Sequence, residues 1–253
     1  MVIELTLRYC LKGNRHQKDA FHKDLFNNNL FNNDLSGETM PQDIQPQTTD
    51  VLPFSQACEN NKTPILAVLK TAFANTKQVL EIGSGTGQHA VYFAANLPQL
   101  FWQTSDQAQY LEDISARCLQ QGHQLGVHNL GLPITLDVSL PWPINGPHID
   151  AVFSANTLHI MSKPKVEAFF NGLGEYLPRL NTLCLYGPFN YQGHFTSDSN
   201  RRFDDLLKQR DSESGIRDVE WIVTLAQAQN LTLVEDIAMP ANNRLLHFKH
   251  LLA

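Results

Sequence analysis

Short apolar runs alternate with longer amphipathic stretches along most of the chain. Runs of this length that are rich in β-branched and aromatic residues are typical of buried strands. We expect strands at 78–82, 101–105, 134–136, 150–155, 182–186, 231–237 and 245–248. Because helical stretches separate most of these runs, the pattern predicts an α/β fold with a parallel sheet covered on both faces. Turn-forming residues at 240–243 predict that the last two runs form an antiparallel hairpin that closes the sheet.

Two of the stretches between strands show a clear helical period. Thr63 followed by Pro64 is typical of a helix start, with a capping residue before a proline in the first turn. The apolar face of this helix is expected to consist of Ile65, Leu66, Val68, Leu69, Ala72 and Phe73. The second helix, which precedes the run at 182–186, carries Val166, Phe169, Phe170, Leu173, Leu177 and Leu180 on one side.

The first fifty residues differ in composition from the rest. They contain an asparagine-rich stretch at 27–33 and a segment rich in Pro, Gln, Asp and Thr at 41–50, and neither has a sustained period. We therefore expect residues 1–50 to be an arm outside the fold and residues 51–253 to form one domain. We also hypothesise that translation begins naturally at Met40, which an intact mass of the endogenous protein that includes the preceding residues would contradict.

Composition and charge disfavour several classes of protein. The chain has 253 residues, of which 42 % are apolar and 17 % charged, as in ordinary globular proteins. Asp and Glu number 25 against 19 Lys and Arg, and the net charge of −6 disfavours a nucleic-acid substrate. No apolar run approaches the ~20 residues of a membrane helix, and Glu4 and Arg8 interrupt the start, so we expect a cytoplasmic protein without a membrane partner. The four cysteines form no CxxC pair and predict neither a metal site nor a disulfide framework.

The strongest chemical signal is a glycine loop between the first strand and the helix that follows it. Gly83, Gly85 and Gly87 stand at alternate positions, with Ser84 between the first two. Such a loop turns backbone N–H groups and a helix N-terminus towards a ligand above the strand end. The loop therefore predicts a nucleotide-type cofactor, although a plain strand-to-helix turn has the same appearance.

Two details favour one cofactor over another. A dinucleotide fingerprint requires Gly or Ala at position 88, where Gln88 stands. Glu81, two residues before the first glycine, would repel a pyrophosphate but could balance the ammonium or sulfonium of S-adenosylmethionine. These details favour S-adenosylmethionine over NAD. The alternative for Glu81 is a carboxylate that merely accepts hydrogen bonds from nearby backbone N–H groups.

Two further carboxylates follow the next two strands. Asp106 ends the second strand, where an acid accepts hydrogen bonds from ribose hydroxyls in nucleoside-binding sheets. Asp137 follows the third strand, where a carboxylate can accept a hydrogen bond from an adenine amino group. An exposed turn residue is the alternative for Asp137.

Glu81 with GxGxG, then Asp106 and Asp137, resembles the motif order of class I S-adenosylmethionine-dependent methyltransferases. The segments 61–66, 80–89, 102–106, 158–160, 185–189, 199–200, 215–218 and 239–243 resemble more closely a family of unknown function within that class, the family that includes methyltransferase-like protein 26. The resemblance spans residues 53–249. It implies a doubly wound, Rossmann-like, seven-stranded sheet with the last strand antiparallel, S-adenosylmethionine as the cofactor, and no established acceptor. One departure is Asn60, where the resemblance leads us to expect Arg.

Methyl transfer is an in-line displacement that depends on holding the acceptor in the right direction. The acceptor side is expected at the carboxyl ends of the fourth and fifth strands, where Asn156, His159 and Tyr186 follow. Asn156 could orient an acceptor or contact the cofactor, and His159 could take a proton near neutral pH. Simpler roles remain open for all three: a turn for Asn156, a ring hydrogen-bonded to backbone for His159, and the edge of the core for Tyr186.

More than 40 residues separate Tyr186 from the run at 231–237, which exceeds what a crossover helix needs. Apolar periods predict two helices in this stretch, which carry Phe203, Leu206 and Leu207, and Ile216, Val219, Ile222 and Val223. We hypothesise that the stretch is a substrate lid that uses His194, Asn200 and Arg217. A structural ion pair of Arg217 with Asp205 or Glu220 is the alternative.

The sequence thus predicts an S-adenosylmethionine-dependent methyltransferase that acts on a small molecule. A methyltransferase-like scaffold that binds the cofactor or its product without catalysis remains open. An NAD-dependent oxidoreductase is a third possibility, which Gln88 and Glu81 disfavour. Nothing in the pattern indicates an oligomeric state.

Overall fold

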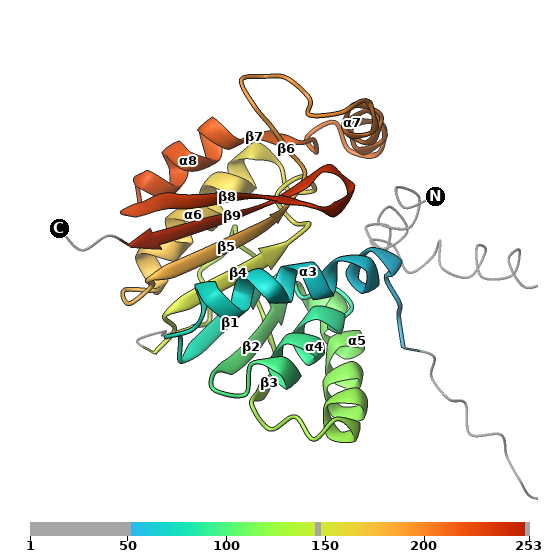
Figure 1. The fold of residues 1–253 in the computed structure, drawn as a ribbon, viewed down its shortest axis with the longest axis vertical. Helices are drawn as coiled ribbons and strands as arrows, with labels where there is room; N and C mark the ends of the chain where they lie inside the picture. Colours follow the sequence, from blue (N-terminus) through green and yellow to red (C-terminus); the bar gives the residue numbers. More distant parts are fainter. Residues whose placement is uncertain (1–51, 145–147, 251–253) are drawn as a thin grey trace, which may run out of the picture.

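The computed structural model describes residues 52–144 and 148–250. Elements carry the labels of Figure 1. The predictions made for residues 1–50, including the arm and the start at Met40, lie outside the described residues.

A seven-stranded sheet forms the centre of the molecule (Figure 1). Its order is β3-β2-β1-β4-β5-β9-β8. The strands are β1 (Gln78–Ile82), β2 (Phe101–Asp106), β3 (Leu130–Thr135), β4 (Ala151–Ala155), β5 (Thr182–Gly187), β8 (Leu231–Met239) and β9 (Asn243–His250). β9 is antiparallel to both of its neighbours, whereas the pairs among β1 to β5 are all parallel. The predicted seven-stranded, mostly parallel sheet with an antiparallel last strand is confirmed.

Helices cover both faces of the sheet, as predicted. On one face, α3 (Gln56–Ala72) and α4 (Gln88–Asn96) bury a core with Val79, Phe153 and Cys184 of the strands. On the other face, α6 (Lys163–Tyr176) and α8 (Val219–Gln227) pack with Leu80 and Val152. Adjacent residues of one strand thus enter opposite cores, because side chains alternate along a strand. α5 (Leu111–Arg117), which one turn of π-helix, η2 (Cys118–Gly122), extends, lies beside β3.

Two element boundaries differ from the predictions. α3 begins at Gln56 after the cap Ser55, whose hydroxyl accepts a hydrogen bond from the Cys58 N–H, so the expected start at Thr63 was wrong. Pro64 instead lies inside α3, and because proline has no N–H, the carbonyl of Asn60 lacks its helical partner. β3 begins at Leu130, earlier than the expected 134, and its Pro133 is tolerated because β3 is an edge strand.

The stretch after β5 adds a separate layer near the strand ends. Helix α7 (Asp198–Arg210) stands apart from the sheet in Figure 1 and has a small core of Phe203, Leu207 and Ile216. The short strands β6 (Phe189–Asn190) and β7 (Arg217–Asp218) pair in parallel. The two predicted helices of this stretch are α7 and α8, but Ile216 precedes α8 and packs in the small core of α7 instead.

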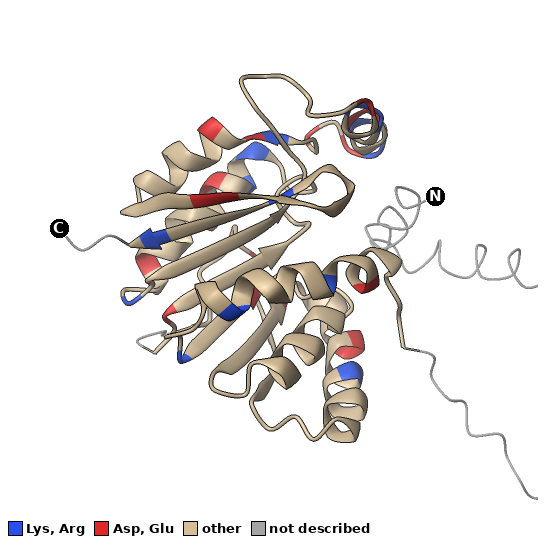
Figure 2. Cartoon of the chain, in the orientation of Figure 1, with Lys and Arg blue, Asp and Glu red and all other residues tan. Residues whose placement is uncertain are grey.

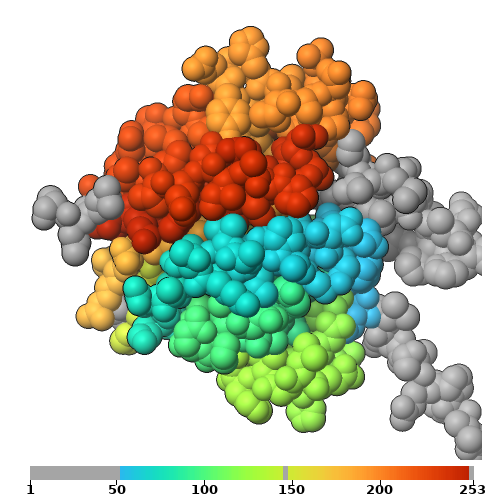
Figure 3. Space-filling model, in the orientation of Figure 1, coloured from blue at the N-terminus to red at the C-terminus, as the bar shows by residue number. Residues whose placement is uncertain are grey.

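Surface charges of both signs are interspersed over the helices in Figure 2, and α7 carries Lys, Arg and Asp side by side. In Figure 3, the surface of α3 lies directly beside that of the β8–β9 hairpin.

Within residues 52–144 and 148–250, no helix combines the length and apolar character that a membrane span requires. The same residues contain no cluster of three or more His, Cys, Asp or Glu side chains that could hold a metal ion.

Candidate active site

The glycine loop connects β1 to α4 at the point where the strand order reverses, between β1 and β4. Ligands of open α/β sheets bind at such switch points. Gly83, Gly85 and Gly87 have φ values of 80°, 58° and 73°, which side chains other than glycine adopt only with strain. The N–H groups of Gly83 and Ser84 both donate to the carbonyl of Ser105, at 3.0 Å each. These two hydrogen bonds therefore attach the loop to β2.

The absence of a side chain at Gly83 has a second consequence. Thr157, in the loop after β4, occupies the space that a β-carbon on Gly83 would need. At the other end of the loop, Gly87 caps α4 and packs beside Arg117. Glycine at 83 thus allows two loops to pack closely together.

Glu81 lies beneath the glycine loop with 1 % of its surface exposed. Its Oε2 accepts hydrogen bonds from Ser84 Oγ at 2.9 Å and from Trp102 Nε1 at 3.1 Å. Burial raises the pKa of Glu81 to about 7, against the lowering effect of these two donors, and nearby Asp106 raises it further. With a pKa of about 7, Glu81 changes between its neutral and its ionised form near neutral pH.

Asp106 connects the glycine loop to the end of β2. Its two carboxylate oxygens accept hydrogen bonds from the N–H groups of Gly85 and Gln107, both at 2.7 Å. Burial raises the pKa of Asp106 to about 6, although both backbone donors lower it. Asp137 follows β3, accepts from the Ser139 N–H at 2.9 Å, and accepts from Gln107 Nε2 at 3.4 Å. The acids at the ends of successive strands therefore lie along one edge of the sheet.

Gln88 occupies the place where a dinucleotide fingerprint needs a small residue. Its side chain is buried, and its Oε1 accepts hydrogen bonds from the Ser55 N–H at 2.6 Å and Thr86 Oγ1 at 3.1 Å. Gln88 therefore attaches the start of α3 to the glycine loop, and a glycine here would remove that attachment.

The chemistry of this edge fits a cationic nucleoside. Glu81, Asp106 and Asp137 supply carboxylates, and none of them forms an ion pair with Lys or Arg within the described part of the chain. In their ionised forms these groups would attract a cationic ligand and repel a pyrophosphate. S-adenosylmethionine combines a cationic amino-acid part with an adenosine, so the residues present fit this cofactor.

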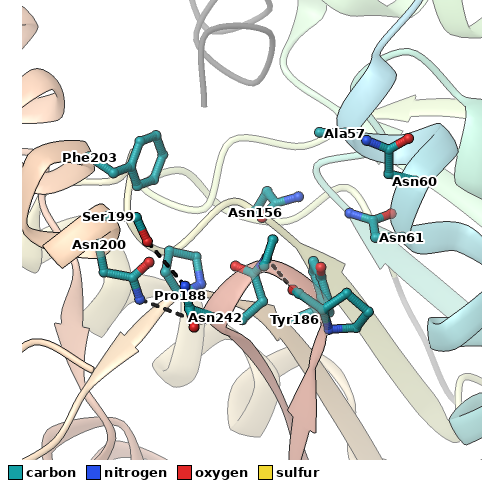
Figure 4. A pocket seen from close by; sticks show the side chains of 13 residues that line it. Ala57, Asn60, Asn61, Asn156, Tyr186, Pro188, Ser199, Asn200, Phe203 and Asn242 are labelled. Atoms are coloured by element: carbon teal, nitrogen blue, oxygen red, sulfur yellow. Dashed lines mark hydrogen bonds between the residues drawn. The ribbon is translucent and has the colours of Figure 1, made fainter. Parts of the chain in front are cut away.

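A pocket of about 340 Å³ lies at the ends of β4 and β5, next to the turn of the β8–β9 hairpin (Figure 4). It is lined by residues of α3, the ends of β4 and β5, α7 and the turn between β8 and β9. Six of the lining residues are asparagines: Asn60, Asn61, Asn156, Asn200, Asn242 and Asn243. Tyr186, Pro188 and Phe203 provide most of the larger apolar surface. The pocket brings together three predicted site residues, Asn156, Tyr186 and Asn200.

Asn156 lines the pocket and directly precedes Thr157, which packs against Gly83. The backbone of Asn156 has a φ of 59°, and its N–H donates to the Tyr186 carbonyl at 2.8 Å. In Figure 4 its side chain lies between the asparagines of α3 and the residues of α7. Asn156 is therefore fixed by its backbone and presents an amide to the pocket.

Tyr186 belongs to a polar network in the pocket wall. Burial raises the pKa of Tyr186 to about 12, although the neighbouring side chains of Asn61 and Asn243 lower it. Asn61 Oδ1 lies 2.7 Å from Nε2 of the buried His89. Burial lowers the pKa of His89 to about 4, so its ring is neutral at pH 7 and donates from Nε2 to Asn61. Tyr186 is therefore a protonated hydroxyl at neutral pH.

His159 lies behind the pocket wall rather than on it, with 2 % of its surface exposed. Its ring meets the edge of Phe203 with centroids 5.2 Å apart. The buried Nε2 has no hydrogen-bond partner in the described structure. Burial, and secondarily the charge of Arg217, lower the pKa of His159 to about 3. In this state the ring is a weak base.

The three residues predicted for a substrate lid lie in different surroundings. Asn200 lines the pocket, and its Nδ2 donates to Thr196 Oγ1 at 2.9 Å and to the Asn242 carbonyl at 3.1 Å. Arg217 is buried and donates to backbone carbonyls rather than pairing with Asp205 or Glu220. His194 is exposed in the turn after β6 and does not line the pocket.

Several pocket residues were not predicted as site residues. Asn61, Ser199, Asn242 and Asn243 come from three segments far apart in the sequence, and all lie in the segments that carry the family resemblance. Asn60, where the resemblance leads us to expect Arg, is exposed at the pocket and accepts from Gln56 Nε2 at 2.9 Å. The signal that could have identified these four residues was their position in the segments that carry the family resemblance.

Residues 52–250 match the model of a family described as "Protein of unknown function (DUF938)". The match covers well over half of the chain. This chain belongs to the DUF938 family. The matched range includes the glycine loop and every described element that lines the pocket, so both features belong to the DUF938 domain.

Solved structures that resemble this DUF938 protein include methyltransferases. The mitomycin 7-O-methyltransferase MmcR aligns with a TM-score of 0.63 at 14 % identity, covering 77 % of this chain and 54 % of that one. An O-methyltransferase family 2 protein from Planctomyces limnophilus, in complex with apigenin, gives 0.64 at 17 % identity, with 76 % and 57 % covered. The O-methyltransferase NcsB1, solved with S-adenosylmethionine and 2-hydroxy-5-methyl naphthoic acid, gives 0.61 at 14 %, with 77 % and 54 % covered. This likeness shows that the DUF938 chain has the Rossmann-like methyltransferase fold. The chain spans little more than half the length of these proteins.

Proposed function

We propose that this protein is an S-adenosylmethionine-dependent methyltransferase that acts on a small-molecule acceptor. The main observation behind the proposal is the glycine loop at the switch point between β1 and β4. Both Glu81 and Asp106 accept hydrogen bonds from residues of this loop. The fold shared with methyltransferases, one of them solved with the cofactor, supports the proposal. The resemblance to the family that includes methyltransferase-like protein 26 supports it as well.

The residues that would hold the cofactor follow from their chemistry. Glu81 would balance the positive charge of the amino-acid part, and the backbone of Gly83, Ser84, Gly85 and Gly87 would lie against it. Asp106 and Asp137 would accept hydrogen bonds from the ribose and the adenine. When bound, S-adenosylmethionine supplies a methyl group on a positively charged sulfur, which makes that methyl group reactive towards a nucleophile.

The chain's own part in the reaction is to bind and orient the acceptor. Asn156 lines the pocket and directly precedes Thr157, which packs against Gly83 of the glycine loop, so its amide is placed to direct an acceptor towards the loop. Tyr186 can donate a hydrogen bond but cannot take a proton at neutral pH, because its pKa is about 12. We assign His159 to the packing behind Phe203, because a ring with a pKa of about 3 is a poor base at pH 7.

A small acceptor is supported by the pocket itself. Its volume of about 340 Å³ is near the lower end of the usual range for small-molecule sites. No Lys or Arg occurs among the described residues that line it, whereas nucleic-acid sites depend on such side chains. We include a cytoplasmic location in the proposal.

Isothermal titration with S-adenosylhomocysteine and with NAD tests the cofactor. We expect the wild-type protein to bind S-adenosylhomocysteine and not NAD, and Asp106→Ala to weaken that binding at least tenfold. Glu112→Gln, an exposed change on α5, is the matched control and is expected to bind as the wild type does. Binding of NAD alone would reject the methyltransferase in favour of an oxidoreductase.

A second experiment separates an enzyme from a scaffold. Purified protein with S-adenosylmethionine that carries a labelled methyl group is incubated with a small-molecule extract of cells. Transfer of label to any component supports catalysis. Binding of S-adenosylhomocysteine without any transfer would favour a scaffold that recognises the cofactor.

A further inference from the structure

The pocket beside Asn156 has an unusual composition for a polar site. Its wall contains six primary amides, yet no Asp, Glu, Lys, Arg or His occurs among the described residues that line it. We propose that this pocket is the acceptor subsite and that it selects uncharged molecules that carry an apolar ring and an amide or hydroxyl group. The inference rests on the proposed function and names the chemical class of its acceptor.

Two cations that directly follow lining residues in the sequence are paired. Lys62 forms an ion pair with Glu59 on α3, and Arg244 pairs with Asp236 at 2.7 Å behind the hairpin. His89, which supports Asn61 from behind, is neutral because its pKa is about 4. A charged ligand would therefore lose water on entry without gaining a partner of opposite charge, whereas a neutral one avoids that loss.

Five of the six amides form side-chain hydrogen bonds within the protein, and Asn156 is the sixth. Asn200 and Asn242 join α7 to the turn between β8 and β9. Asn200 Nδ2 donates to the Asn242 carbonyl, and Asn242 Nδ2 donates to Ser199 Oγ at 3.1 Å. Asn243 Nδ2 donates to the Pro240 carbonyl at 3.2 Å. Asn156, in contrast, has a side-chain amide with no hydrogen-bond partner among the described residues. An amide offers both a donor and acceptors, so it matches a ligand amide or hydroxyl.

The remaining wall suits a ring. Phe203, Pro188 and the ring of Tyr186 face the same cavity from α7 and the end of β5. Flat apolar side chains of this kind contribute most of the free energy with which small-molecule pockets bind aromatic ligands. An apolar body against these residues leaves a polar group of the ligand free to meet Asn156.

Backbone strain gives an independent indication that the pocket is functional. Five non-glycine residues in the described chain have positive φ, and three of them line the pocket: Asn156 at 59°, Ala241 at 58° and Asn242 at 58°. Such conformations are strained and concentrate at binding sites. These residues lie in the loop after β4 and in the hairpin turn, which both line the pocket.

The test uses three probes of similar shape and different charge: 2-naphthamide, 2-naphthoate and 2-naphthamidine. Their affinities for the full chain are measured by isothermal titration at pH 7.5, with and without saturating S-adenosylhomocysteine. We expect the neutral amide to bind at least tenfold more tightly than either charged probe, in both conditions. Asn60→Arg, an exposed change at the pocket, is expected to raise the affinity for 2-naphthoate at least tenfold. Thr71→Arg, exposed in the last turn of the same helix, is the matched control and should leave all three affinities unchanged.

Several results would overturn the proposal. These are binding of a charged probe as tight as that of the amide, no binding of any probe at millimolar concentration, or an equal effect of Asn60→Arg and Thr71→Arg. Loss of amide binding in the presence of S-adenosylhomocysteine would assign the pocket to the cofactor instead. Failure of S-adenosylhomocysteine to bind, with the preference for the amide intact, would reject the methyltransferase and leave a pocket for neutral ligands.

Discussion

Thr157 packs against Gly83 so closely that a β-carbon on Gly83 would overlap its Cγ2 methyl group and lie 3.7 Å from its Cβ. The contact joins the loop after β1 to the loop after β4. Ser154 strengthens the junction, because its hydroxyl donates to the Ile82 carbonyl at 2.7 Å and lies 2.7 Å from Thr157 Oγ1. The glycine loop and the strained Asn156 are therefore held in one rigid arrangement.

Gly83→Ala tests this junction. The substitution adds both the strain of a positive φ and an overlap with Thr157, so we expect it to lower the free energy of unfolding by about 3 kcal/mol. Gly193→Ala is the matched control, because its φ of 76° is similar but nothing lies within 4 Å of the added carbon. The control should cost only about 1 kcal/mol. Equal losses in urea unfolding of the two variants would show that the contact with Thr157 contributes nothing.

Glu81→Gln separates stability from cofactor binding. The pKa of Glu81 is raised from 4.5 to about 7, so between these pH values the folded protein binds more protons than the unfolded chain. Stability from this group therefore falls as the pH rises through that window, by about 3 kcal/mol in total. Glutamine imitates the protonated acid, so the variant should match the wild type near pH 4.5 and exceed it in stability at pH 8.

Urea unfolding at several pH values measures the difference, with the exposed Glu112→Gln as the control. The same Glu81→Gln protein is expected to bind S-adenosylhomocysteine at least tenfold more weakly, because the charge that balances the ammonium is gone. If the difference in stability between the variant and the wild type is the same at pH 4.5 and at pH 8, the raised pKa of Glu81 is contradicted. Unchanged cofactor binding would instead remove Glu81 from the proposed site.

Sequence reasoning located the sheet because each strand is a buried run with its own hydrophobic signal. The glycine loop was found for a similar reason, since its chemistry depends on neighbouring residues. The exact start of α3 was missed because Thr63–Pro64 has the local pattern of a helix start. The true cap is Ser55, whose N–H donates to Gln88, a residue 33 positions away in the sequence. Local patterns thus predicted those features that local interactions determine.

The pocket could be predicted only in part. Asn156 and Tyr186 were found because they follow strands whose carboxyl ends meet at one edge. Asn61 and Asn242 were not, because their place in the wall depends on how α3 and the hairpin pack across that edge. Arg217 was predicted to be a ligand or a partner of surface acids, and its actual contacts are carbonyls whose positions only the folded loops determine.

Tyr186→Phe tests the polar network of the pocket wall. Removing the hydroxyl leaves the amides of Asn61 and Asn243 without that partner in a buried setting, so we expect a loss of about 1–2 kcal/mol in the free energy of unfolding. Tyr92→Phe is the control, because its hydroxyl makes only an exposed contact of 3.3 Å with Thr63. The control should remain within about 0.5 kcal/mol of the wild type. A loss no larger than that of the control would contradict a structural role for the network.

Arg217→Met tests the support behind the pocket. Arg217 donates from Nε to the Leu158 carbonyl at 3.3 Å, and from Nη2 to the carbonyls of Met161 and, at 2.8 Å, Glu213. Its loss leaves these carbonyls without a charged donor, so we expect the free energy of unfolding to fall by about 2–4 kcal/mol. Arg202→Met on α7, which is exposed, is the matched control and should stay within about 0.5 kcal/mol.

The same variant changes the protonation of His159 in a defined direction. Burial is the main cause of the low pKa of His159, about 3, and the charge of Arg217 is the second. Removing that charge should therefore raise the pKa measured by NMR titration of the ring, while burial keeps it below the ordinary 6.5. Arg202→Met should leave the titration unchanged. A pKa of His159 near 6.5 in the wild-type protein would show that the ring is exposed in solution, and it would restore His159 as a base for the acceptor.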